Sequence, residues 1–277
     1  MKISVVIAVY NKIRELQLVL TALSTQTFGN FEAIVADDGS GEEMTRFIHQ
    51  FQKNSPFEIV HVRQEDMGFR KNRILNKAIK RSGTDYLVFI DGDCIPHIDF
   101  VKAHYRNIKK NVILCGKRVN LSKKLSYEMT VERILNVKYK TVNLRHFIDS
   151  FRNKNERSTY VEEGVHLQNS FFRKILLEKN PHIVGCNFSL HKDLLEKING
   201  FDENYIGPGI GEDSDIEYRL RLAGAEFHSL RYLAILYHLY HKSTNEEDKN
   251  YQYFEEVKKK KEYFCSNGLI RVRNEVQ

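Results

Sequence analysis

The first hundred residues alternate between short apolar runs and longer segments in which apolar side chains recur at helical spacing. The first run, Ile3–Val9, is β-branched and too short for a buried helix, so it is typical of a strand covered on both faces. Further strands are predicted at Phe31–Ala36, Phe57–Val62 and Tyr86–Ile90, with a helical segment in each interval. This order predicts βαβ crossovers and therefore an α/β fold, in which helices flank both faces of a mostly parallel sheet.

Polar residues follow three of the predicted strands directly. They are Tyr10-Asn11, Asp37-Asp38 and Asp91-Gly92-Asp93. The carboxyl ends of parallel strands meet at one edge of a sheet, and ligands bind beyond that edge. The sequence therefore predicts a ligand site at this edge, built from the three clusters.

The segment from about residue 117 to 181 has a different composition. It holds 14 Lys and Arg against 7 Asp and Glu, which equals the whole formal net charge of +7. We therefore expect a basic helical insertion within a single domain over residues 1–241. The parts before and after it are expected at 1–116 and 182–241, followed by a basic helical tail at 242–277.

The part after the insertion, residues 182–241, continues the alternation. In chain order we expect a strand, a helix, a glycine-rich loop, a second helix and a last strand, at Ile183–Leu190, 192–198, 205–211, Ile216–Ala223 and Phe227–Leu236. The glycine-rich loop is either a rigid turn or a mobile lid. Four polar residues, Glu212-Asp213-Ser214-Asp215, precede the second helix, where carboxylates complement its dipole.

The pair Asp91 and Asp93 is the sharpest chemical feature. Two carboxylates two residues apart at the end of a buried strand can reach one hard cation, and Gly92 between them lets a ligand approach the backbone closely. Bound Mn²⁺ or Mg²⁺ there would neutralise the charge of a leaving diphosphate. An ordinary Asp-Gly turn is the structural alternative. The two other polar strand ends favour the metal site.

Other residues could complete a nucleotide site. Asp37 and Asp38 could accept hydrogen bonds from a nucleobase imide and a ribose, or could form a helix N-cap or an Asx turn, and one interpretation could hold for each aspartate. Arg70 and Lys71 follow a glycine, where cations could meet a diphosphate, although a solvated helix face explains Lys71 nearly as well. A neutral imidazole from His238 or His241 could join a carboxylate metal site, and sequence spacing does not separate the two.

Composition narrows the class of protein. The 277 residues are 42% apolar and 29% charged, which is typical of a globular chain, and no apolar run approaches the length of a membrane span. No cleavage site follows the apolar N-terminus, and the four cysteines are scattered, so we expect a cytoplasmic protein.

The basic excess bears on the choice of partner. Basic chains bind phosphorylated ligands, anionic membrane surfaces or nucleic acid. No helix-turn-helix, zinc or RNA-binding aromatic signature is present, so nucleic acid is not an expected partner. Peripheral contact with the inner face of a membrane is expected instead, because anionic lipid attracts basic segments.

Four segments together resemble a family-2 nucleotide-sugar glycosyltransferase with the GT-A fold. They are ISVVIAVYN, FEAIVADDGS, YLVFIDGDCIP and INGFDENYIGPGIGEDSDIEYRL. The last is similar to the C-terminal motif of β-1,4-galactosyltransferases and bacterial chondroitin-polymerase-type enzymes. The resemblance covers about residues 1–116 and 183–241.

The resemblance implies a role for each matching position. The donor-binding positions are Ala8, Tyr10, Asp38, Arg70, Asp91 and Gly92, with Asp38 reading uracil and Asp91 on the ribose side. The resemblance makes Asp93 and His238 the metal ligands. It also makes Asp213 the catalytic base and Glu212 the residue that orients the acceptor.

These observations predict an inverting, metal-dependent glycosyltransferase that uses a UDP-sugar donor and a glycan or lipid-linked glycan acceptor, as in bacterial surface polysaccharide synthesis. Inversion is implied by the resemblance alone. A non-catalytic nucleotide- or glycan-binding module of the same fold is the alternative, although the intact set of acids argues against it. Galactose, N-acetylgalactosamine, glucose and glucuronic acid donors all remain open.

Overall fold

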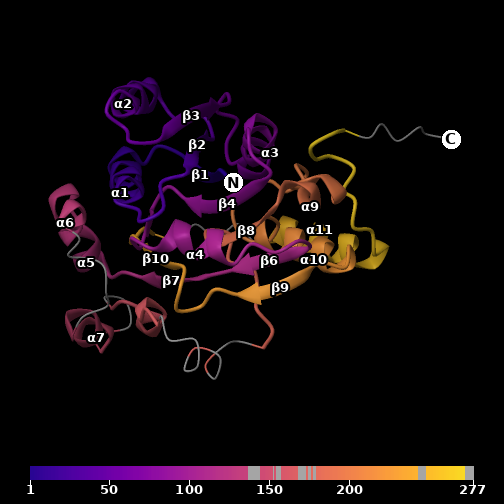
Figure 1. The fold of residues 1–277 in the computed structure, drawn as a ribbon. Coiled ribbons are helices and arrows are strands. Elements are labelled where there is room, and N and C mark those ends of the chain that lie inside the picture. The colour runs from indigo at the N-terminus through magenta and orange to yellow at the C-terminus, as the bar shows by residue number, and fades with distance from the viewer. Residues whose placement is uncertain are drawn as a thin grey trace.

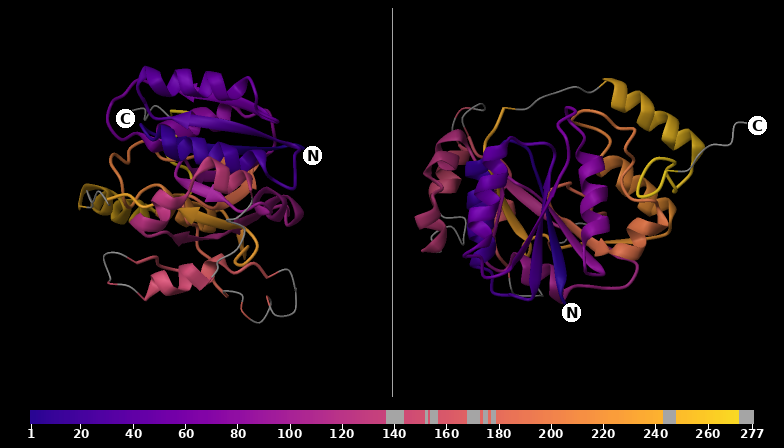
Figure 2. Two further views of the ribbon diagram at one scale, coloured as in Figure 1. Left: turned by 90° about the vertical axis from the view of Figure 1, so that its left-hand side faces the viewer. Right: turned by 90° about the horizontal axis from the view of Figure 1, so that it is seen from above.

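The computed structural model describes residues 1–136, 144–151, 153, 157–167, 173, 176, 179–242 and 248–271. Much of the second half of the expected insertion and the last residues of the expected tail lie outside these ranges. Figures 1 and 2 show one α/β unit whose central strands are covered by helices.

The central sheet has seven strands in the order β3-β2-β1-β4-β8-β6-β9. Their bounds are β1 Ile3–Val9, β2 Phe31–Asp37, β3 Glu58–Arg63, β4 Tyr86–Asp91, β6 Val112–Cys115, β8 Phe188–His191 and β9 Glu226–Ser229. The first four strands pair in parallel, β8 is antiparallel to both its neighbours, and β6 and β9 are again parallel. The expected mostly parallel α/β sheet is therefore confirmed.

Side chains alternate between the two faces of β1, so the strand contributes to two separate cores. Ile3, Val5 and Ile7 face one core, in which α1 (Ile13–Ser24), α2 (Glu42–Gln52) and α4 (Phe100–Arg106) are packed. Val6 faces the other core, with α3 (Lys71–Arg81), α9 (Lys192–Lys197) and α10 (Asp213–Leu222). A strand buried on both faces must be apolar at successive positions, which is the pattern of this run.

Two expected strands in the second half differ from the structure. Only the end of the predicted strand Ile183–Leu190 pairs in the sheet, as β8. The strand predicted at Phe227–Leu236 is two strands, because residues 230–234 form a turn that carries the chain from β9 to β10 (Ile235–His238). An apolar run cannot show by itself where a chain leaves one sheet for another.

A second, three-stranded sheet lies beside the first, in the order β5-β10-β7. The strand β5 is Cys94–Pro96 and β7 is Lys117–Asn120, so the range expected to be a helical insertion begins with a strand. Val119 is fully buried in the core and the backbone of β7 pairs in parallel with β10, which explains the difference.

The remaining elements lie on opposite sides of the molecule (Figure 1). They are α5 Lys123–Glu128, α6 Val131–Leu135, α7 Leu144–Ser150 and the 3₁₀ helix η1 Val161–Gly164, and, on the other side, α11 Asp248–Lys260. No helix of the described residues is both long and apolar enough to cross a bilayer.

A buried polar network joins the two sheets. His104 is fully buried, its Nε2 donates to Oδ1 of Asn187 at 3.2 Å, and its Nδ1 accepts from the Ser189 hydroxyl at 2.7 Å. Asn187 in turn donates to the carbonyls of Lys117 and Ala234, at 2.7 and 2.9 Å. Burial lowers the pKa of His104 to about 3, and the bond to Asn187 only partly offsets this, so the ring is neutral in the folded protein.

Stability should therefore fall in acid. Below about pH 6.5 the unfolded chain binds a proton at His104 that the folded protein does not bind until about pH 3. The free energy of unfolding should decrease across this window by up to about 1.4 kcal/mol per pH unit from this group. Urea unfolding at pH 7 and pH 5 measures the slope. His104→Gln should flatten it relative to the unsubstituted protein, and an unchanged slope would contradict the assignment.

Candidate functional site

A cavity of about 810 Å³ opens at the carboxyl edge of the parallel strands. Residues that follow β1 and β4, the start of α3, the strand β7, the glycine-rich loop and the segment after β10 line it. Eight of the predicted site residues are among them: Ala8, Tyr10, Asp38, Asp91, Gly92, Asp93, Glu212 and His238. Arg70 and Asp213 do not line this cavity.

The register of β1, β2 and β4 brings the strand ends together. Ala8 is paired with Asp91 in the sheet, and the carbonyl of Ala8 accepts a 2.7 Å hydrogen bond from the Gly92 N–H. A Cβ on Gly92 would lie 3.0 Å from side-chain atoms of Val9 and 3.1 Å from the Ala8 oxygen, so only glycine fits without displacement. Close backbone contact thus fixes the turn that carries the two aspartates.

The adjacent acids Asp37 and Asp38 have different partners. Asp37 is fully buried and accepts from the backbone N–H of Ser40 at 2.8 Å, with the His61 ring at 3.1 Å. Burial raises its pKa, but the bonds from His61 and Ser40 outweigh burial and leave the pKa lowered. Asp37 therefore holds the turn after β2, as a structural residue.

Asp38 faces the cavity and accepts the Arg70 backbone N–H at 2.8 Å. Burial raises the pKa of Asp38, and its hydrogen bonds offset this only in part. The Arg70 side chain itself turns to the carbonyl of Phe69 at 2.8 Å. Arg70 therefore contributes its backbone N–H to the site, whereas the sequence predicted that its guanidinium would do so. Tyr10 is 46% exposed and its hydroxyl donates to Asp66.

A lysine lies between two acids of the site. The Lys71 Nζ is 2.7 Å from Asp91 Oδ1 and 2.7 Å from Glu212 Oε1, and only 14% of its side chain is exposed. Burial lowers the pKa of Lys71, but the two carboxylates outweigh burial and raise it well above its ordinary value. Burial also raises the pKa of Glu212, and Lys71 acts against that rise. The solvated helix face allowed for Lys71 by the sequence is not what the structure shows.

Asp93 is the most buried acid of the cavity, at 5% exposure, and three cationic or imidazole side chains surround it. The Lys12 Nζ is 2.6 Å from Oδ2, the His238 Nε2 is 3.6 Å from Oδ1 and the His241 Nε2 is 3.5 Å from Oδ2. The two histidine rings are also 3.2 Å apart at their Nε2 atoms. Antiparallel pairing of His238 with Cys94 places this histidine beside the aspartate.

These side chains fit a divalent cation. Ligand atoms of Asp93, Cys94 and His238 all lie within 4.8 Å of one another. Burial lowers the pKa of His238 to about 4, so its ring is neutral, as a metal ligand must be. Carboxylate and imidazole ligands suit Mn²⁺, and carboxylates suit Mg²⁺. Lys12 would then have to release Asp93, which its flexible side chain permits.

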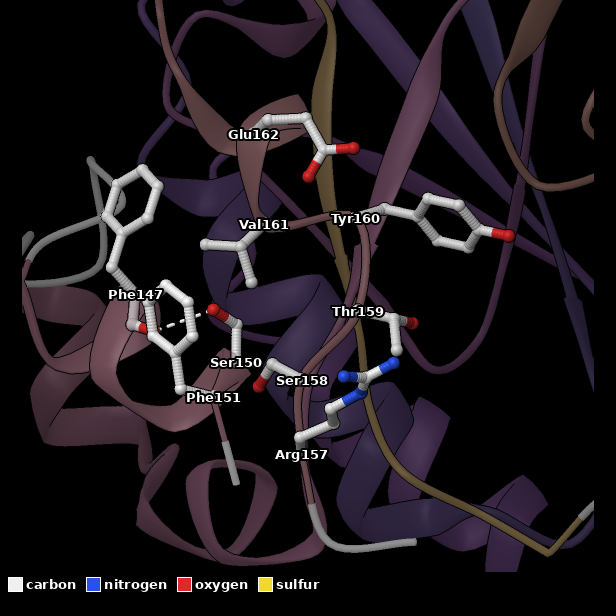
Figure 3. Close-up of a pocket in the computed structure, with 9 residues that line it drawn as sticks. All are labelled: Phe147, Ser150, Phe151, Arg157, Ser158, Thr159, Tyr160, Val161 and Glu162. Atoms are coloured by element: carbon white, nitrogen blue, oxygen red, sulfur yellow. Dashed lines mark hydrogen bonds between the residues drawn. The ribbon is translucent and has the colours of Figure 1, made fainter. Parts of the chain in front are cut away.

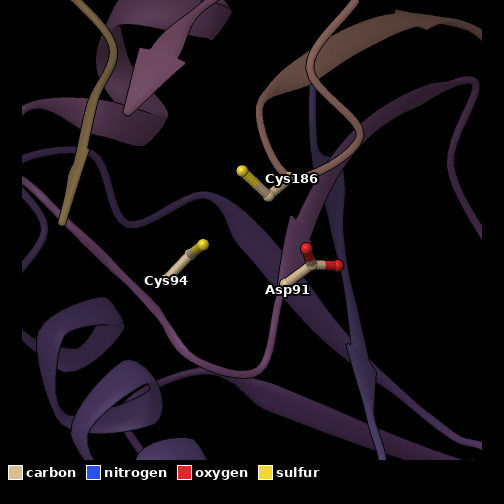
Figure 4. Close-up of side chains that lie close together, drawn as sticks. All are labelled: Asp91, Cys94 and Cys186. Atoms are coloured by element: carbon tan, nitrogen blue, oxygen red, sulfur yellow. The ribbon is translucent and has the colours of Figure 1, made fainter. Parts of the chain in front are cut away.

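A second triad lies next to the first. Figure 4 shows Asp91, Cys94 and Cys186 close together, with ligand atoms within 4.8 Å of one another. Both cysteines are buried and free, and burial, followed by the neighbouring Cys186, raises the pKa of Cys94 well above its ordinary value. Protonated thiols are poor ligands for Mn²⁺ or Mg²⁺, so we interpret the two cysteines as packing beneath the acids.

The acids at the start of α10 lie in different environments. Asp215 is fully buried in an ion pair with Arg219, at 2.6 Å, and Arg219 also donates to the carbonyls of Ile198 and Gly200. Asp215 therefore holds Arg219, which fastens α10 to the residues that follow α9. Asp213 Oδ1 accepts from the Ser214 backbone at 2.8 Å, and within the described part of the chain Asp213 forms no ion pair.

A shallower cavity, of about 530 Å³, lies next to β7. Figure 3 shows Phe147 and Phe151 on one side of it and the Arg157 guanidinium on the other. Thr159, which also lines it, exchanges backbone hydrogen bonds with Asn120, and Asn120 lines the larger cavity. The two cavities are therefore separated by little more than one pair of residues.

Residues of the cavity that the sequence did not single out include Lys12, Arg118 and Tyr240. Arg118 lies on β7 and donates to the sulfur of Cys186 at 3.4 Å. The sequence did not identify Arg118, because it lies on a strand that was expected to be helix, and no motif in the sequence distinguished Lys12 or Tyr240. For Lys71, the sequence contained one indication of a buried ion pair, which is that this lysine is expected to lie near the acids at the strand ends.

Two family models match the chain. Residues 4–198 match the family model described as glycosyl transferase family 2. Residues 166–242 match the model described as the N-terminal domain of galactosyltransferase. The second match contains Glu212, Asp213 and His238.

Curated relatives are longer proteins. A chondroitin synthase of Escherichia coli is 27% identical over 85% of this chain and 34% of its own length. A chondroitin synthase of Pasteurella multocida is 26% identical over 81% of this chain and 23% of its length. An uncharacterized glycosyltransferase, YfnE of Bacillus subtilis, is 26% identical over 82% of this chain and 62% of its length. The chain thus spans about a third or less of the two chondroitin synthases.

Solved structures share the fold at low identity. A mannosyltransferase from Pyrobaculum calidifontis, in complex with GDP-Man and Mn²⁺, gives a TM-score of 0.56 at 15% identity, over 87% of this chain and 57% of that one. TarS 1-349 of S. aureus, in complex with UDP-GlcNAc, gives 0.55 at 19% identity, over 88% and 60%. These likenesses confirm the expected GT-A fold.

The ion pairs of Lys71 can be tested by removing its charge. Lys71→Met keeps the aliphatic stem but leaves Asp91 and Glu212 facing each other without a cation. Breaking such a buried pair should lower the free energy of unfolding by about 3 kcal/mol, measured by urea denaturation. Lys80→Met, on the exposed side of the same helix, is the matched control and should change it by less than about 0.5 kcal/mol. Equal effects of the two substitutions would contradict this account of Lys71.

Proposed function

Because the chain belongs to glycosyl transferase family 2, we propose that it transfers a sugar from a UDP-sugar to a hydroxyl group of a glycan or lipid-linked glycan. The observation that carries the proposal is the meeting of Asp91, Asp93, His238 and Glu212 in one cavity at the carboxyl edge of the sheet. By analogy with the named relatives, the product would belong to a bacterial surface polysaccharide.

The donor is proposed to lie across the ends of β1, β2 and β4. Asp38 would read the uracil, since its carboxylate faces the cavity, and Ala8 and Tyr10 would hold the base and ribose. Asp91 would bind on the ribose side, with Gly92 allowing the donor close to the backbone. Arg70 would contribute mainly by fixing Asp38 through its backbone N–H.

Asp93 and His238 are proposed to hold Mn²⁺ or Mg²⁺, with His241 as a further candidate ligand at a similar distance from Asp93. A divalent ion bound there supplies positive charge to a diphosphate. The Mn²⁺ of the Pyrobaculum mannosyltransferase supports the choice of a divalent ion. Lys12 lies against the same carboxylate and can offset the charge of Asp93 when no ion is bound.

Asp213 is proposed as the general base. It would take the proton of the acceptor hydroxyl while the acceptor oxygen forms a bond to the anomeric carbon. The bond from that carbon to the diphosphate breaks on the opposite face, so the configuration inverts and UDP leaves. Glu212, which is paired with Lys71, would orient the acceptor, whereas Asp213 has no ion pair in the described chain.

The acceptor is proposed to approach from the side of β7. The shallower cavity there offers two phenylalanine rings and a guanidinium, groups that can contact sugar rings and anionic substituents. The basic excess of residues 117–181 is proposed to contact anionic lipid peripherally, which suits a lipid-linked acceptor. We place the reaction at the cytoplasmic side of the membrane on the same grounds.

A non-catalytic binding module of the same fold is the second candidate, and it differs only in the absence of turnover. Asp213 adjoins the cavity acid Glu212 and has no ion pair with any residue that the structure describes, which favours an enzyme. Metal-dependent nucleotide binding without release of UDP from any UDP-sugar would favour the module.

Removal of the metal should weaken donor binding. Calorimetric titration of UDP should show binding with Mn²⁺ that is lost or strongly weakened in EDTA. Asp93→Ala should reproduce the loss with Mn²⁺ present, while Asp193→Ala, at an exposed position of α9, should not. Binding that is equally tight with EDTA would contradict the proposed metal site.

Substitution of the base should separate binding from transfer. Asp213→Asn preserves size and can still accept the Ser214 N–H, but it cannot take a proton. Transfer should fall by about 10²–10⁴-fold with UDP affinity nearly unchanged. Asp193→Asn serves as the matched control and should retain activity. Full activity of the Asp213→Asn variant would show that another group is the base.

A further inference from the structure

One basic side chain of the larger cavity differs from the others in its partners. Four basic residues of the described chain line this cavity, and they are Lys12, Lys71, Arg118 and Lys242. Lys12 and Lys71 are paired with acids of the site, and Lys242 is exposed, so water can solvate its charge. Arg118 is half-buried, yet it forms no ion pair with any carboxylate among the residues that the structure describes.

The alternation of side chains along β7 directs Arg118 to the cavity. The strand pairs in parallel with β10, and the register places Asn120, two residues after Arg118, beside His238. Arg118 and Asn120 both line the cavity, whereas Val119 between them is fully buried in the core. The guanidinium therefore comes from the strand next to the one that ends in His238, the proposed metal ligand.

Within the described part of the chain, the Arg118 side chain makes one hydrogen bond, and it is a weak one. The Arg118 Nη1 donates to the Cys186 sulfur at 3.4 Å, and a cysteine sulfur is a weak acceptor. A guanidinium carries five N–H donors, so most of them remain available to a ligand in the cavity.

The contact with Cys186 places Arg118 near acids from both halves of the site. The Cys186 sulfur and the Asp91 carboxylate have ligand-capable atoms within 4.8 Å of each other (Figure 4). The residue before Cys186, Gly185, donates its N–H to Asp213 Oδ2 at 3.4 Å. The guanidinium therefore lies close to the part of the cavity in which the proposed transfer takes place.

Asp91 is not an ion-pair partner of this arginine. The Asp91 Oδ1 is held by the Lys71 Nζ at 2.7 Å, and Asp91 attracts Arg118 only at longer range. An arginine stays ionised in proteins, and a charge that is partly removed from water is stabilised by an opposite charge. The cavity therefore offers a guanidinium to an anionic group that enters it.

We propose that Arg118 binds an oxyanion of the substrate, with its guanidinium donating to phosphate or carboxylate oxygens. This inference rests on the proposed function, because it takes the ligand of the cavity to be a UDP-sugar. The planar guanidinium can donate two parallel hydrogen bonds to one phosphate or carboxylate group, which an ammonium group cannot do. The oxyanion is either the diphosphate of UDP or the carboxylate of a uronic acid donor, two sources of the same chemistry.

The two sources give Arg118 different roles. Contact with the diphosphate would add a second cation to the proposed metal at the leaving group, where negative charge develops. Contact with a sugar carboxylate would instead favour a uronic acid donor over a neutral one, because a neutral hexose offers the guanidinium no charge.

Calorimetric titrations of the full chain in the presence of Mn²⁺ test this inference. Uridine, UDP, UDP-glucose and UDP-glucuronic acid are compared in the unsubstituted protein and in Arg118→Met, which keeps the aliphatic stem. If Arg118 binds the diphosphate, the affinities for UDP and both UDP-sugars should fall at least about tenfold, with the affinity for uridine unchanged. If Arg118 binds the sugar carboxylate, only the affinity for UDP-glucuronic acid should fall by this factor. Arg106→Met, at an exposed arginine at the end of α4, is the matched control and should change none of the four affinities.

A second variant guards against a folding defect. Arg118→Lys keeps the positive charge and should restore part of the lost affinity, and the melting temperatures of all variants are measured in parallel. Affinities of Arg118→Met for UDP and UDP-glucuronic acid that equal those of the unsubstituted protein would overturn the role of Arg118 alone. A loss of affinity for uridine as large as the loss for UDP would overturn it as well, since it would indicate a displaced cavity. No binding of UDP by the unsubstituted protein would contradict the proposed donor, and this inference with it.

Discussion

Crowded negative charge at one edge of the sheet is the constraint on which the rest of the site depends. The parallel register of β1, β2 and β4 brings Asp38, Asp91 and Asp93 to the same edge, where they are partly or wholly removed from water. Carboxylates in such a place are stable only if cations or hydrogen-bond donors accompany them. Lys71 accompanies Asp91, and Lys12 accompanies Asp93.

The pairing of these carboxylates with lysines also joins the first half of the domain, which contains α3, to the second half, which contains α10. Lys71 begins α3, yet its second carboxylate, Glu212, comes from the start of α10 more than a hundred residues later. Asn72 strengthens the same junction, since its side chain donates to the carbonyls of Asp202 and Gly211 at 2.7 and 3.1 Å. The ion pair that balances charge in the first half therefore also positions Glu212 of the second half at the cavity.

The parts of this architecture that local chemistry determines were predictable from the sequence. Strands β1, β2 and β4 are continuous apolar runs because both their faces are buried, and the polar residues that follow them had to lie at one edge. The second sheet was not predictable, because β7 is four mixed residues whose only strong signal is Val119. The environment of Lys71 could not be decided from the sequence, because helical periodicity fits a lysine at the start of a helix equally well in solvent and in a buried ion pair.

The ion pair with Lys71 distinguishes two adjacent acids for which different roles are proposed. Glu212 and Asp213 are neighbours, but Glu212 faces the cavity beside Asp91, and burial raises its pKa while Lys71 holds it down. A carboxylate bound to a lysine at 2.7 Å can accept hydrogen bonds from an acceptor but gives up that pairing if it takes a proton. Asp213 has no such partner in the described chain. The roles proposed above, with Glu212 orienting the acceptor and Asp213 as the base, are consistent with the position of Lys71.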